Sequence, residues 1–528
     1  MQFQNLPLGS SSFEALRSSK EIYVDKTDLI FQLASSRGKI FLARPRRFGK
    51  SLLVSTFESL FEKGTDFFPG LSIQSLWQDK KYPVIRLDFS EVKEFSDAVD
   101  FRKNFESYLA QKFLKAGFVC KNSENFFVEL SSWLDNLPTN SLVILIDEYD
   151  AALTVCLDSL TLLNEIKKVM SRFFLVLKAN EGCLRFFFMT GITKFSNTSI
   201  FSAFNNLVDI SMDPKYGTIL GYTESELKKN FGDYLNRASD VLLLSPQELI
   251  VQLRRHYNGF CFDEEAATSV YCPWSVLNFL NRPERGFQNY WYQSAGQPSV
   301  LLKYLSHHPL SEPMSYSQEK EVRLTELQAA RQYDDIGLEA LLAQAGYLTI
   351  KNITPDRYAI LGYPNQEVAV SMAELYANEL LKGQRLKQNG APYVADVLAR
   401  GTVNEVVATL NAALNAIDYQ RYPIVDEASC RAYLQVLLIG AAMMPKVEIH
   451  TALGRSDMEL DAGKRHWVFE FKYVKTAKEV TQALKDVVEQ MSSRRYGMSS
   501  KAKELRRLVL VFSRDERRFV ASQEVVDN

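Results

Sequence analysis

The sequence predicts an α/β protein made of three successive segments. Over the first third of the chain, short apolar runs alternate with amphipathic helical patterns, as in a parallel, doubly wound sheet. A middle segment then carries mainly short helical patterns. The last segment again combines strand and helix patterns, which is typical of a second α/β domain. We expect the three domains to cover residues 1–220, 221–415 and 416–528.

Length and charge limit the classes of protein that fit. The 528 residues correspond to three or four domains at about 150 residues each. Lys and Arg number 62 against 63 Asp and Glu, a net charge of −1, which excludes a uniformly basic nucleic-acid coat but not a local basic site. The N-terminus lacks the apolar core of a signal peptide, and no run reaches the ~20 apolar residues of a membrane span. We therefore expect a soluble, cytoplasmic protein with no membrane partner.

The first segment supplies the strands and helices of the expected parallel sheet. Its third apolar run, Leu142–Ile146, is continuous, which indicates a strand covered on both faces. The expected strands are Lys39–Ala43, Tyr82–Phe89, Leu142–Ile146 and Leu184–Met189. The helical patterns between them are Leu52–Phe61, Asp100–Lys115, Asn125–Leu134 and Leu162–Leu177.

A basic turn joins the first expected strand to the first helix. Backbone N–H groups at such a helix start can face phosphate oxygens, so this context favours a phosphate-binding loop. Lys50 would reach the β- and γ-phosphates of ATP, and Ser51 would ligate Mg²⁺. Arg44 replaces the first glycine of GxxxxGK[ST], so an ordinary basic turn remains an alternative. The loop residues are Arg44, Pro45, Arg46, Arg47, Phe48, Gly49, Lys50 and Ser51, and the three arginines would add positive charge beside the phosphates.

Acidic and hydroxyl side chains follow two of the other expected strands. Asp147, at the tip of the third strand, would hold Mg²⁺ through its water shell, and Glu148 would polarise the attacking water. Thr190 ends the fourth strand, and Thr193 and Lys194 follow it, where polar groups could sense a γ-phosphate. Capping roles are the alternative for all of them. Combined with the basic turn, the pattern predicts ATP hydrolysis or an ATP-dependent switch.

The middle and last segments have less regular patterns. Helices are expected at Glu224–Tyr234, Pro246–Tyr257, Trp274–Asn281, Leu338–Ala345, Met372–Leu386 and within Val394–Ile417, with a hairpin over Tyr347–Leu361. In the last segment, helices are expected at Ala428–Met444 and Ala477–Ser492, and strands at Val447–Thr451, Arg455–Leu460, His466–Val474 and Leu508–Phe512.

Two strands of the last segment are expected to form a charged hairpin. With Ala462-Gly463 as the turn, Asp461 pairs with Lys464 and Asp457 lies opposite Val468. Asp457 and Glu470 then become diagonal neighbours on one face, near enough for both carboxylates to reach one ion. A slip of one residue would move Asp457 to the other face.

The side chains of this hairpin suit phosphodiester hydrolysis. Asp457 and Glu470 would bind Mg²⁺, and Lys472 would orient or deprotonate a water or stabilise developing charge. Burial of such charges in an apolar strand is costly unless they meet a metal or partners. Glu448 could supply a further carboxylate. A surface hairpin with an ordinary Glu–Lys face is the alternative.

Basic residues gather after this hairpin. Residues 491–518 contain nine Lys or Arg and three acidic residues, a local charge of 9 − 3 = +6, as a nucleic-acid surface requires. A solvated helical face is the alternative. The side chains expected to contact a nucleic-acid backbone are Gln490, Arg494, Arg495 and Tyr496.

Taken together, these residues resemble the bacterial AAA-ATPase-like family that carries a C-terminal PD-(D/E)XK nuclease domain. The resemblance implies a P-loop NTPase core with a parallel sheet, a helical, lid- or winged-helix-like middle region, a restriction-endonuclease-like end, and Mg²⁺ at both sites. One departure is that no acidic residue is evident on the helix before the hairpin, where Cys430 stands with Glu427 one turn earlier. The matching stretches are Tyr23–Thr27, Arg44–Ser51, Leu145–Asp150, Thr190–Phe195, Phe201-Ser202, Asn205–Leu207, Tyr257–Phe260, Cys272–Ser275, Tyr290-Trp291, Gly346–Thr349, Pro364–Val368, Gly454–Asp457, Phe469–Lys472, Gln490 and Tyr496.

The sequence therefore predicts an ATP-binding, ATP-regulated, Mg²⁺-dependent nuclease that cleaves nucleic acid, with DNA as the favoured substrate. The alternative is a nucleotide-switched interaction or remodelling ATPase whose nuclease-like domain binds nucleic acid without cutting it. A homo-oligomer is compatible with either prediction.

Overall fold

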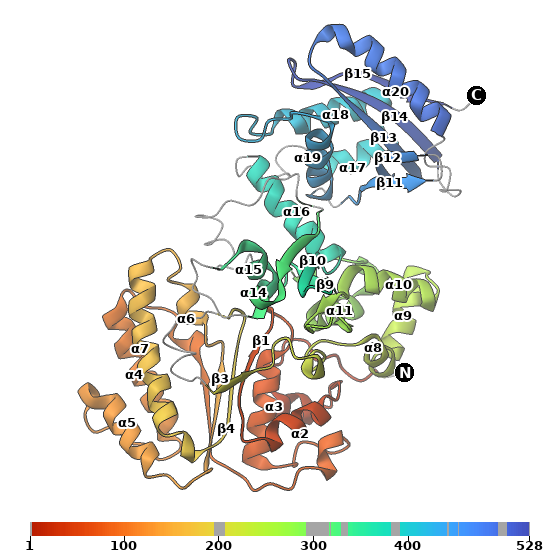
Figure 1. Ribbon diagram of the computed structural model, residues 1–528. Helices are drawn as coiled ribbons and strands as arrows, with labels where there is room; N and C mark the ends of the chain where they lie inside the picture. The colour runs from red at the N-terminus through yellow and green to blue at the C-terminus, as the bar shows by residue number, and fades with distance from the viewer. Residues whose placement is uncertain are drawn as a thin grey trace. The chain divides into compact units, whose positions relative to one another are not determined.

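The computed structural model describes residues 3–194, 206–291, 316, 318–328, 336–381, 391–440, 443–451, 454–494 and 504–526. The chain divides into two compact units, shown in Figure 1. The first comprises Met1–His308 and Glu319–Val368, and the second comprises Pro309–Gln318 and Ala369–Asn528. The finer division at residues 220 and 415 stays a prediction. In the described part of the chain, no helix has the length and apolar character needed to cross a membrane.

A five-stranded parallel sheet forms the centre of the first unit. The strand order is β2-β3-β4-β1-β5, and every pair of neighbours is parallel. All residues of β3 and β4 are buried, which confirms the two-sided burial expected of these apolar runs. The strands are β1 (Lys39–Ala43), β2 (Val84–Asp88), β3 (Leu142–Asp147), β4 (Leu184–Gly191) and β5 (Leu207–Asp209).

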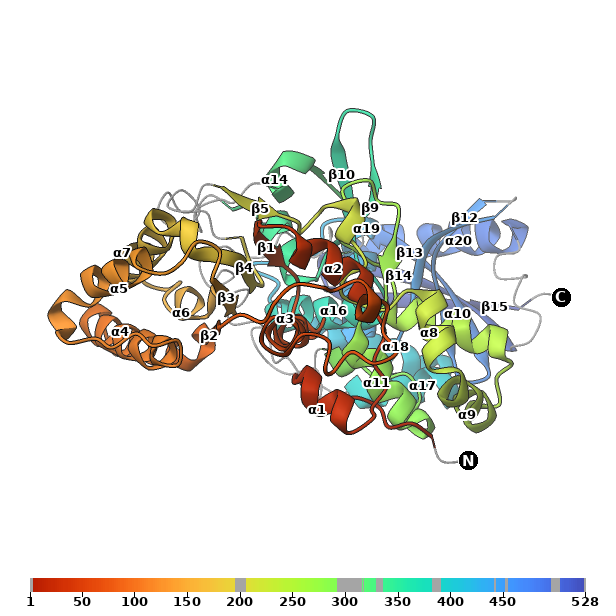
Figure 2. The same ribbon diagram turned by 90° about the horizontal axis from the view of Figure 1, so that it is seen from below.

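Helices cover both faces of this sheet, as Figures 1 and 2 show. The first group is α1 (Phe13–Ser18), α2 (Thr27–Ser35) and α3 (Lys50–Lys63), and the group across the sheet is α4 (Ala98–Leu114), α5 (Phe126–Asp135) and α7 (Leu160–Ala179), with the short α6 (Ala151–Thr154) directly after β3. Helix α3 begins directly after Gly49, so the predicted phosphate-binding turn does open a helix.

A helical subregion completes the first unit. Leu227, Phe231, Leu253, Tyr257 and Phe279 form its core and are almost completely buried. The helix expected over residues 224–234 is in fact two helices that meet at Phe231. The helices are α8 (Glu224–Asn230), α9 (Gly232–Leu242), α10 (Pro246–Tyr257), α11 (Pro273–Asn281), α14 (Leu324–Gln328) and α15 (Leu338–Ala345). The strands are β6 (Phe260–Cys261), β7 (Ser269–Val270), β8 (Lys320–Arg323), β9 (Thr349–Ile353) and β10 (Tyr358–Gly362), of which the last three form a sheet ordered β8-β10-β9.

The second unit contains a five-stranded sheet ordered β11-β12-β13-β14-β15. Only β13 and β14 run parallel; the other neighbours are antiparallel. Its strands are β11 (Lys446–Thr451), β12 (Gly454–Ala462), β13 (Arg465–Val474), β14 (Glu504–Ser513) and β15 (Arg518–Val525). The sequence does not predict β15, because few of its residues are buried and they do not alternate.

Helices pack on this second sheet and fix its two faces. Val487 and Met491 of α20 contact Val468 and Val509, so the face that carries Val468 and Glu470 lies under α20. On the other face, the indole of Trp467 donates a 2.8 Å hydrogen bond to Leu398 of α17. The helices on the sheet are α17 (Ala391–Arg400), α18 (Val403–Asn415), α19 (Glu427–Gly440) and α20 (Val480–Arg494). Helix α16 (Gln366–Leu380) begins in the first unit and continues into the second. The expected helix Met372–Leu386 extends past α16 into residues 382–386, which lie outside the described residues.

Candidate functional site

The predicted phosphate-binding loop connects β1 to α3 and has an unusual backbone. Arg47 (φ +69°) and Gly49 (φ +96°) both have positive φ. The ammonium of Lys50 donates to the carbonyls of Arg44 and Pro45, both at 3.0 Å. The first N–H groups of any α-helix lack intrahelical acceptors and attract anions. With two carbonyls held by Lys50, the loop is shaped to present the start of α3 to a ligand.

Side chains of the helical subregion hold the next two carbonyls of the loop. The indole N–H of Trp291 donates to the carbonyl of Arg46 at 3.2 Å. The Cys272 thiol lies 3.9 Å from the carbonyl of Arg47, and the Arg47 guanidinium stacks 4.3 Å from the ring centroid of Trp274. Each carbonyl of residues 44–47 thus accepts a hydrogen bond from a side chain, so the loop conformation is fixed before any ligand binds.

Two predicted loop residues point into the protein. The sequence predicts Arg44 beside the phosphates, but its guanidinium is 1% exposed and donates to three carbonyls, those of Ala43, Ser211 and Tyr216. Burial lowers the pKa of Arg44 to about 9. Its Nη1 and Nη2 atoms are therefore held by carbonyls inside the fold, while its buried Nε has no hydrogen-bond partner. Phe48 is equally buried and anchors the loop against the rings of residues 260 and 262.

The acidic residues after β3 meet the start of α3. Asp147 is 1% exposed, its Oδ1 accepts the N–H of Glu148, and its Oδ2 has no hydrogen-bond partner. Burial raises the pKa of Asp147, while a hydrogen bond with Ser51 and the charge of Lys50 oppose the rise. Burial also raises the pKa of Glu148, whose φ of +48° turns it away from the strand. The structure therefore brings Lys50, Ser51, Asp147 and Glu148 together.

Asp88 is a further acidic residue at this edge of the sheet that the motifs do not identify. It ends β2 and pairs in register with Asp147 of β3. Its charge raises the pKa of both Asp147 and Glu148. The available signal was its place at the end of a predicted strand, since carboxyl ends of parallel strands share one edge.

The loop after β4 is locked to Asp150. The Oδ2 atom of Asp150 accepts hydrogen bonds from the N–H groups of Ile192 and Thr193 and from the Thr193 hydroxyl. Thr190 is completely buried, and its hydroxyl donates to Leu42 at 2.7 Å. Its role toward a γ-phosphate stays a prediction. Residues 195, 201, 202 and 205, which carry part of the resemblance, lie outside the described residues.

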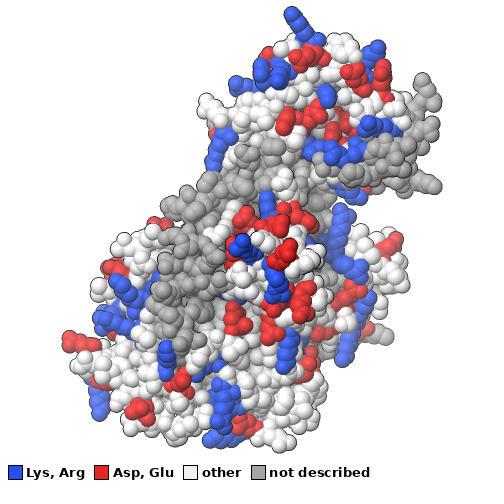
Figure 3. Space-filling model, in the orientation of Figure 1, with Lys and Arg blue, Asp and Glu red and all other residues white. Residues whose placement is uncertain are grey.

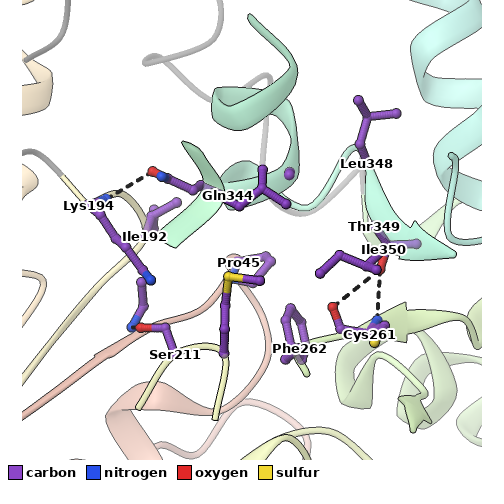
Figure 4. Close-up of a pocket in the computed structure, with 14 residues that line it drawn as sticks. Pro45, Ile192, Lys194, Ser211, Cys261, Phe262, Gln344, Leu348, Thr349 and Ile350 are labelled. Carbon is purple, nitrogen blue, oxygen red and sulfur yellow. Dashed lines mark hydrogen bonds between the residues drawn. The ribbon is translucent and has the colours of Figure 1, made fainter. Parts of the chain in front are cut away.

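Lys194 lines a small cavity beside the phosphate-binding loop (Figure 4). Its ammonium pairs with Asp209 at 2.7 Å, and its N–H donates to the side chain of Gln344. Pro45 and Cys261 also line the cavity, whose volume is about 60 Å³. A cavity of this volume has room for a few ordered water molecules.

A second, apolar slot of about 80 Å³ opens on the other side of Gly49. Leu52, Leu220 and Tyr222 line it together with Tyr23 and other residues of the N-terminal region. The Tyr23–Thr27 motif therefore borders the start of α3, a role that the motif alone does not reveal. Lys26 of this motif pairs with Glu226 at 2.5 Å and ties the N-terminal region to α8.

In the second unit, the charged hairpin forms with a different register from the one predicted. Met458 pairs with Phe469 and Asp461 with His466, so the turn is Gly463-Lys464 and the expected turn Ala462-Gly463 is wrong. Gly463 takes the positive φ of +58° at the first turn position, while Ala462 is buried in the strand. The correction moves the partner of Asp457 from Val468 to Glu470. The two carboxylates keep their common face and become direct neighbours.

The two hairpin carboxylates are buried to different degrees. Glu470 is 4% exposed, and its Oε1 has no hydrogen-bond partner. Burial and then the adjacent Asp457 raise the pKa of Glu470. Asp457 accepts the N–H of Phe471 at 2.9 Å, and Nη1 of Arg431 lies 3.4 Å from its other oxygen. The pair is therefore desolvated and held on a single side of the hairpin.

Helix α19 supplies the acidic residue that the sequence did not place. The carboxylate of Glu427 lies 2.7 Å from the ammonium of Lys472, and Cys430 is buried. Because Val447 pairs with Met458 and Ile449 with Ser456, Glu448 stands opposite Asp457 in the neighbouring strand. The structure therefore gathers Glu427, Asp457, Glu470 and Lys472, with Glu448 at an adjacent register position.

The expected nucleic-acid contacts are described only in part. Gln490 is half-buried on α20, and Arg494 is exposed at its end, where its charge partly opposes the rise in the pKa of Glu470 that burial causes. Arg495, Tyr496, Lys501 and Lys503 lie outside the described residues.

Arginines of the basic stretch have acidic partners close by. Arg506 pairs with Glu504 and Glu524, Arg514 with Asp515 and Arg518 with Glu516. Figure 3 shows basic and acidic side chains interspersed on the visible face of this unit. Arg506, Arg514 and Arg518 thus have their charge offset by a neighbouring carboxylate.

Both carboxylate clusters fit a divalent cation. Asp147 Oδ2 and Glu470 Oε1 are buried oxygens without partners, which is costly unless a ligand satisfies them. Mg²⁺ prefers carboxylate oxygens and usually keeps several waters. Among the described residues, no three His, Cys, Asp or Glu side chains form a complete metal cage. A cation at either site would therefore keep waters or take oxygens from a substrate.

The fold and both sites define an ATPase-like protein with a nuclease-like C-terminal domain. Residues 7–201 match the family model described as predicted AAA-ATPase, and residues 430–522 match the PD-(D/E)XK nuclease superfamily. The chain is 31% identical over 539 residues to the uncharacterized protein in the vnfD 5′ region of Azotobacter chroococcum mcd 1, with 98% of each chain covered. The chain therefore belongs to this family of predicted AAA-ATPases with a C-terminal PD-(D/E)XK nuclease superfamily domain, which confirms the resemblance.

Proposed function

We propose that this protein is an ATP-regulated, Mg²⁺-dependent nuclease that cleaves DNA. The observation that carries the proposal is that Asp457 and Glu470 adjoin the paired residues Met458 and Phe469 on facing strands. Lys472 follows Glu470 by two residues, and the domain matches the PD-(D/E)XK nuclease superfamily. One carboxylate of the pair is buried with an unsatisfied oxygen, the arrangement a cation would complete.

At the ATPase-like site, the start of α3 binds the phosphates of ATP. Lys50 moves from the loop carbonyls to the β- and γ-phosphates, which lie within reach of the same short loop. Ser51 and Asp147 hold Mg²⁺ and Glu148 orients the attacking water.

At the nuclease-like site, the side chains of the hairpin position the scissile phosphate and a water. Bound Mg²⁺ lowers the pKa of a coordinated water and neutralises charge on the phosphate. Asp457 and Glu470 would hold it. Lys472 leaves Glu427 to orient the attacking water or to stabilise the developing negative charge. Gln490, Arg494, Arg495 and Tyr496 contact the nucleic-acid backbone.

A nuclease assay with a charge-matched control tests the second site. We expect the wild-type chain with Mg²⁺ and ATP to cut DNA, and Lys472→Ala to abolish cutting while ATP hydrolysis persists. Lys464→Ala removes the same charge from the exposed hairpin turn and should cut normally. Equal cutting by Lys472→Ala and the wild type would refute the assignment. Single- and double-stranded DNA and RNA should be compared.

ATP binding is tested separately at Lys50. We expect Lys50→Ala to lose ATP binding in a titration with a fluorescent ATP analogue. Lys115→Ala, at the exposed end of α4, serves as the control. If ATP regulates the nuclease, Lys50→Ala should also lose the effect of ATP on DNA cutting. Normal ATP binding by Lys50→Ala would exclude this loop as the site.

A binding function without cleavage is the second candidate. It is favoured by the ion pair between Lys472 and Glu427, which occupies the catalytic ammonium, and by the local pairing of the described arginines. In that case, ATP would change the affinity for nucleic acid and no variant or cofactor would produce cleavage products.

A further inference from the structure

An arginine faces the carboxylate pair from helix α19. Arg431 Nη1 lies 3.4 Å from Oδ1 of Asp457, and the two side chains are 17% and 16% exposed. Arg431 follows Glu427 by four residues, which places both on one face of α19. The same helix face thus presents a cation to Asp457 and an anion to Lys472. Neither the family motifs nor the sequence pattern assigns a role to Arg431.

Two ion pairs lie in this site. Asp457 lies 3.4 Å from Arg431, and Glu427 lies 2.7 Å from Lys472. Glu470 lies beside Asp457 and remains desolvated. A divalent cation that binds Asp457 would be repelled by the guanidinium beside it at this separation. If Arg431 keeps its contact with Asp457, it weakens the binding of the cation. Tight binding of the cation therefore requires Arg431 to leave Asp457.

We propose that Arg431 is a substrate-binding residue that holds Asp457 in the empty site and moves to a phosphate of the nucleic acid when substrate binds. The move frees Asp457 for the cation. This inference rests on the proposed nuclease function, because it assigns a cation to Asp457 and a phosphodiester to the same site. Arg431 would then couple the binding of the metal to the binding of nucleic acid.

The chemistry of arginine suits an exchange between these two anions. The guanidinium is planar, stays charged, and binds carboxylate and phosphate oxygens with the same fork of N–H donors. A backbone phosphate carries a full negative charge, so it can replace the carboxylate as the partner. Lysine would keep the charge but lose the fork. If bound metal raises the affinity for nucleic acid by some factor, bound nucleic acid must raise the affinity for the metal by the same factor.

The test measures Mn²⁺ binding by electron paramagnetic resonance, with the full-length chain and without nucleotide. The nucleic-acid probe is a short mixed-sequence DNA duplex with phosphorothioate linkages, which keep the charge and resist cleavage. The component of Mn²⁺ binding that Asp457→Asn removes defines the site. Arg431→Gln, Arg431→Lys and Arg400→Gln are compared. Arg400 is an exposed arginine of α17 in the same unit, and its replacement controls for the loss of one positive charge.

For the wild type and Arg400→Gln, we expect the duplex to tighten Mn²⁺ binding by about tenfold, within the range typical of coupled sites. Arg431→Gln should bind Mn²⁺ several-fold more tightly than the wild type without DNA, and the duplex should change that affinity less than twofold. Arg431→Lys should fall between them. A melting curve for each variant shows whether it is folded. If Arg431→Gln is unfolded, Arg431→Lys is compared with the wild type instead.

Two failures can be told apart. If no variant shows an Mn²⁺ site that depends on Asp457, the proposed metal-dependent function fails and this inference falls with it. If the Asp457 site binds Mn²⁺ but both Arg431 variants match the wild type with and without the duplex, only the role of Arg431 is overturned.

Discussion

The indole N–H of Trp291 donates a 3.2 Å hydrogen bond to the carbonyl of Arg46 in the phosphate-binding loop. The backbone N–H of the same tryptophan donates at 2.6 Å to the buried carboxylate of Glu367. Glu367 is the second residue of α16, and its other oxygen accepts the hydroxyl of Ser275. One aromatic residue thus connects the loop to the beginning of a helix more than 300 residues later in the chain.

Loss of this indole donor should weaken nucleotide binding. Trp291→Phe keeps an aromatic ring but leaves the Arg46 carbonyl without its donor, which costs about 1 kcal/mol. If the loop must hold its shape to bind phosphate, the dissociation constant for ATP should rise about fivefold. A titration with a fluorescent ATP analogue measures it. Trp133→Phe, in a cluster with Phe113 and Phe118, is the control and should leave ATP binding unchanged.

Glu367 should make stability depend on pH. Burial raises its pKa from an ordinary 4.5 to about 8, so between these values the folded protein holds a proton that the unfolded chain lacks. The stabilisation is complete below pH 4.5 and is lost as the pH rises through 8, at up to about 1.4 kcal/mol per pH unit.

Glu367→Gln imitates the protonated side chain and should flatten this dependence. Its amide oxygen can accept the Trp291 N–H and its NH₂ can donate to Ser275. Chemical unfolding of both proteins between pH 5 and pH 9 checks the difference, with the exposed Glu321→Gln as the control. Parallel curves for Glu367→Gln and wild type would show that Glu367 does not titrate in this range.

Gly259 should tolerate no side chain. It has a φ of +95°, and a Cβ atom there would lie 2.1 Å from the carbonyl oxygen of Pro364. We expect Gly259→Ala to lower the free energy of unfolding by about 3 kcal/mol or more. Gly232, at the start of α9, has open space at the Cβ position, and Gly232→Ala should change stability by less than about 1 kcal/mol. Denaturant unfolding compares the two, and equal effects would contradict the close approach.

Glu470 should be required for DNA cleavage but should lower the stability of the metal-free protein. Its carboxylate is buried beside Asp457, and one oxygen has no partner. Glu470→Gln replaces a carboxylate whose burial is unfavourable, so we expect the metal-free protein to gain about 1 kcal/mol of stability while DNA cleavage is abolished. Melting curves without metal and a cleavage assay with Mg²⁺ test the two effects. A less stable Glu470→Gln protein would show that the carboxylate supports the fold.

Much of the fold could be predicted because it depends on local patterns. The continuous apolar run of β3 and the strand–turn–helix context of Lys50 each determine a buried strand or a helix start. The hairpin register was wrong because an alternation of period two is satisfied by a shift of two residues, and Gly463 lies in the turn of both registers.

The remaining site residues depend on tertiary neighbours. Arg44 looks like a phosphate contact in the sequence, but carbonyls from residues 211 and 216 bury its charge. Asp88 and Glu427 reach the sites from a separate strand and helix, and no local spacing links them to Asp147 or Lys472. Charge, spacing and periodicity cannot report such pairings between distant segments.

The local pairing of Arg506, Arg514 and Arg518 with acidic neighbours has a consequence for how this domain would respond to salt. A protein that neutralises phosphates releases condensed cations from DNA, and each phosphate neutralised adds about 0.9 to the slope of log affinity against log salt concentration. An arginine that already has a carboxylate partner contributes less to that release. These three arginines would therefore add little to the salt dependence with which a duplex binds.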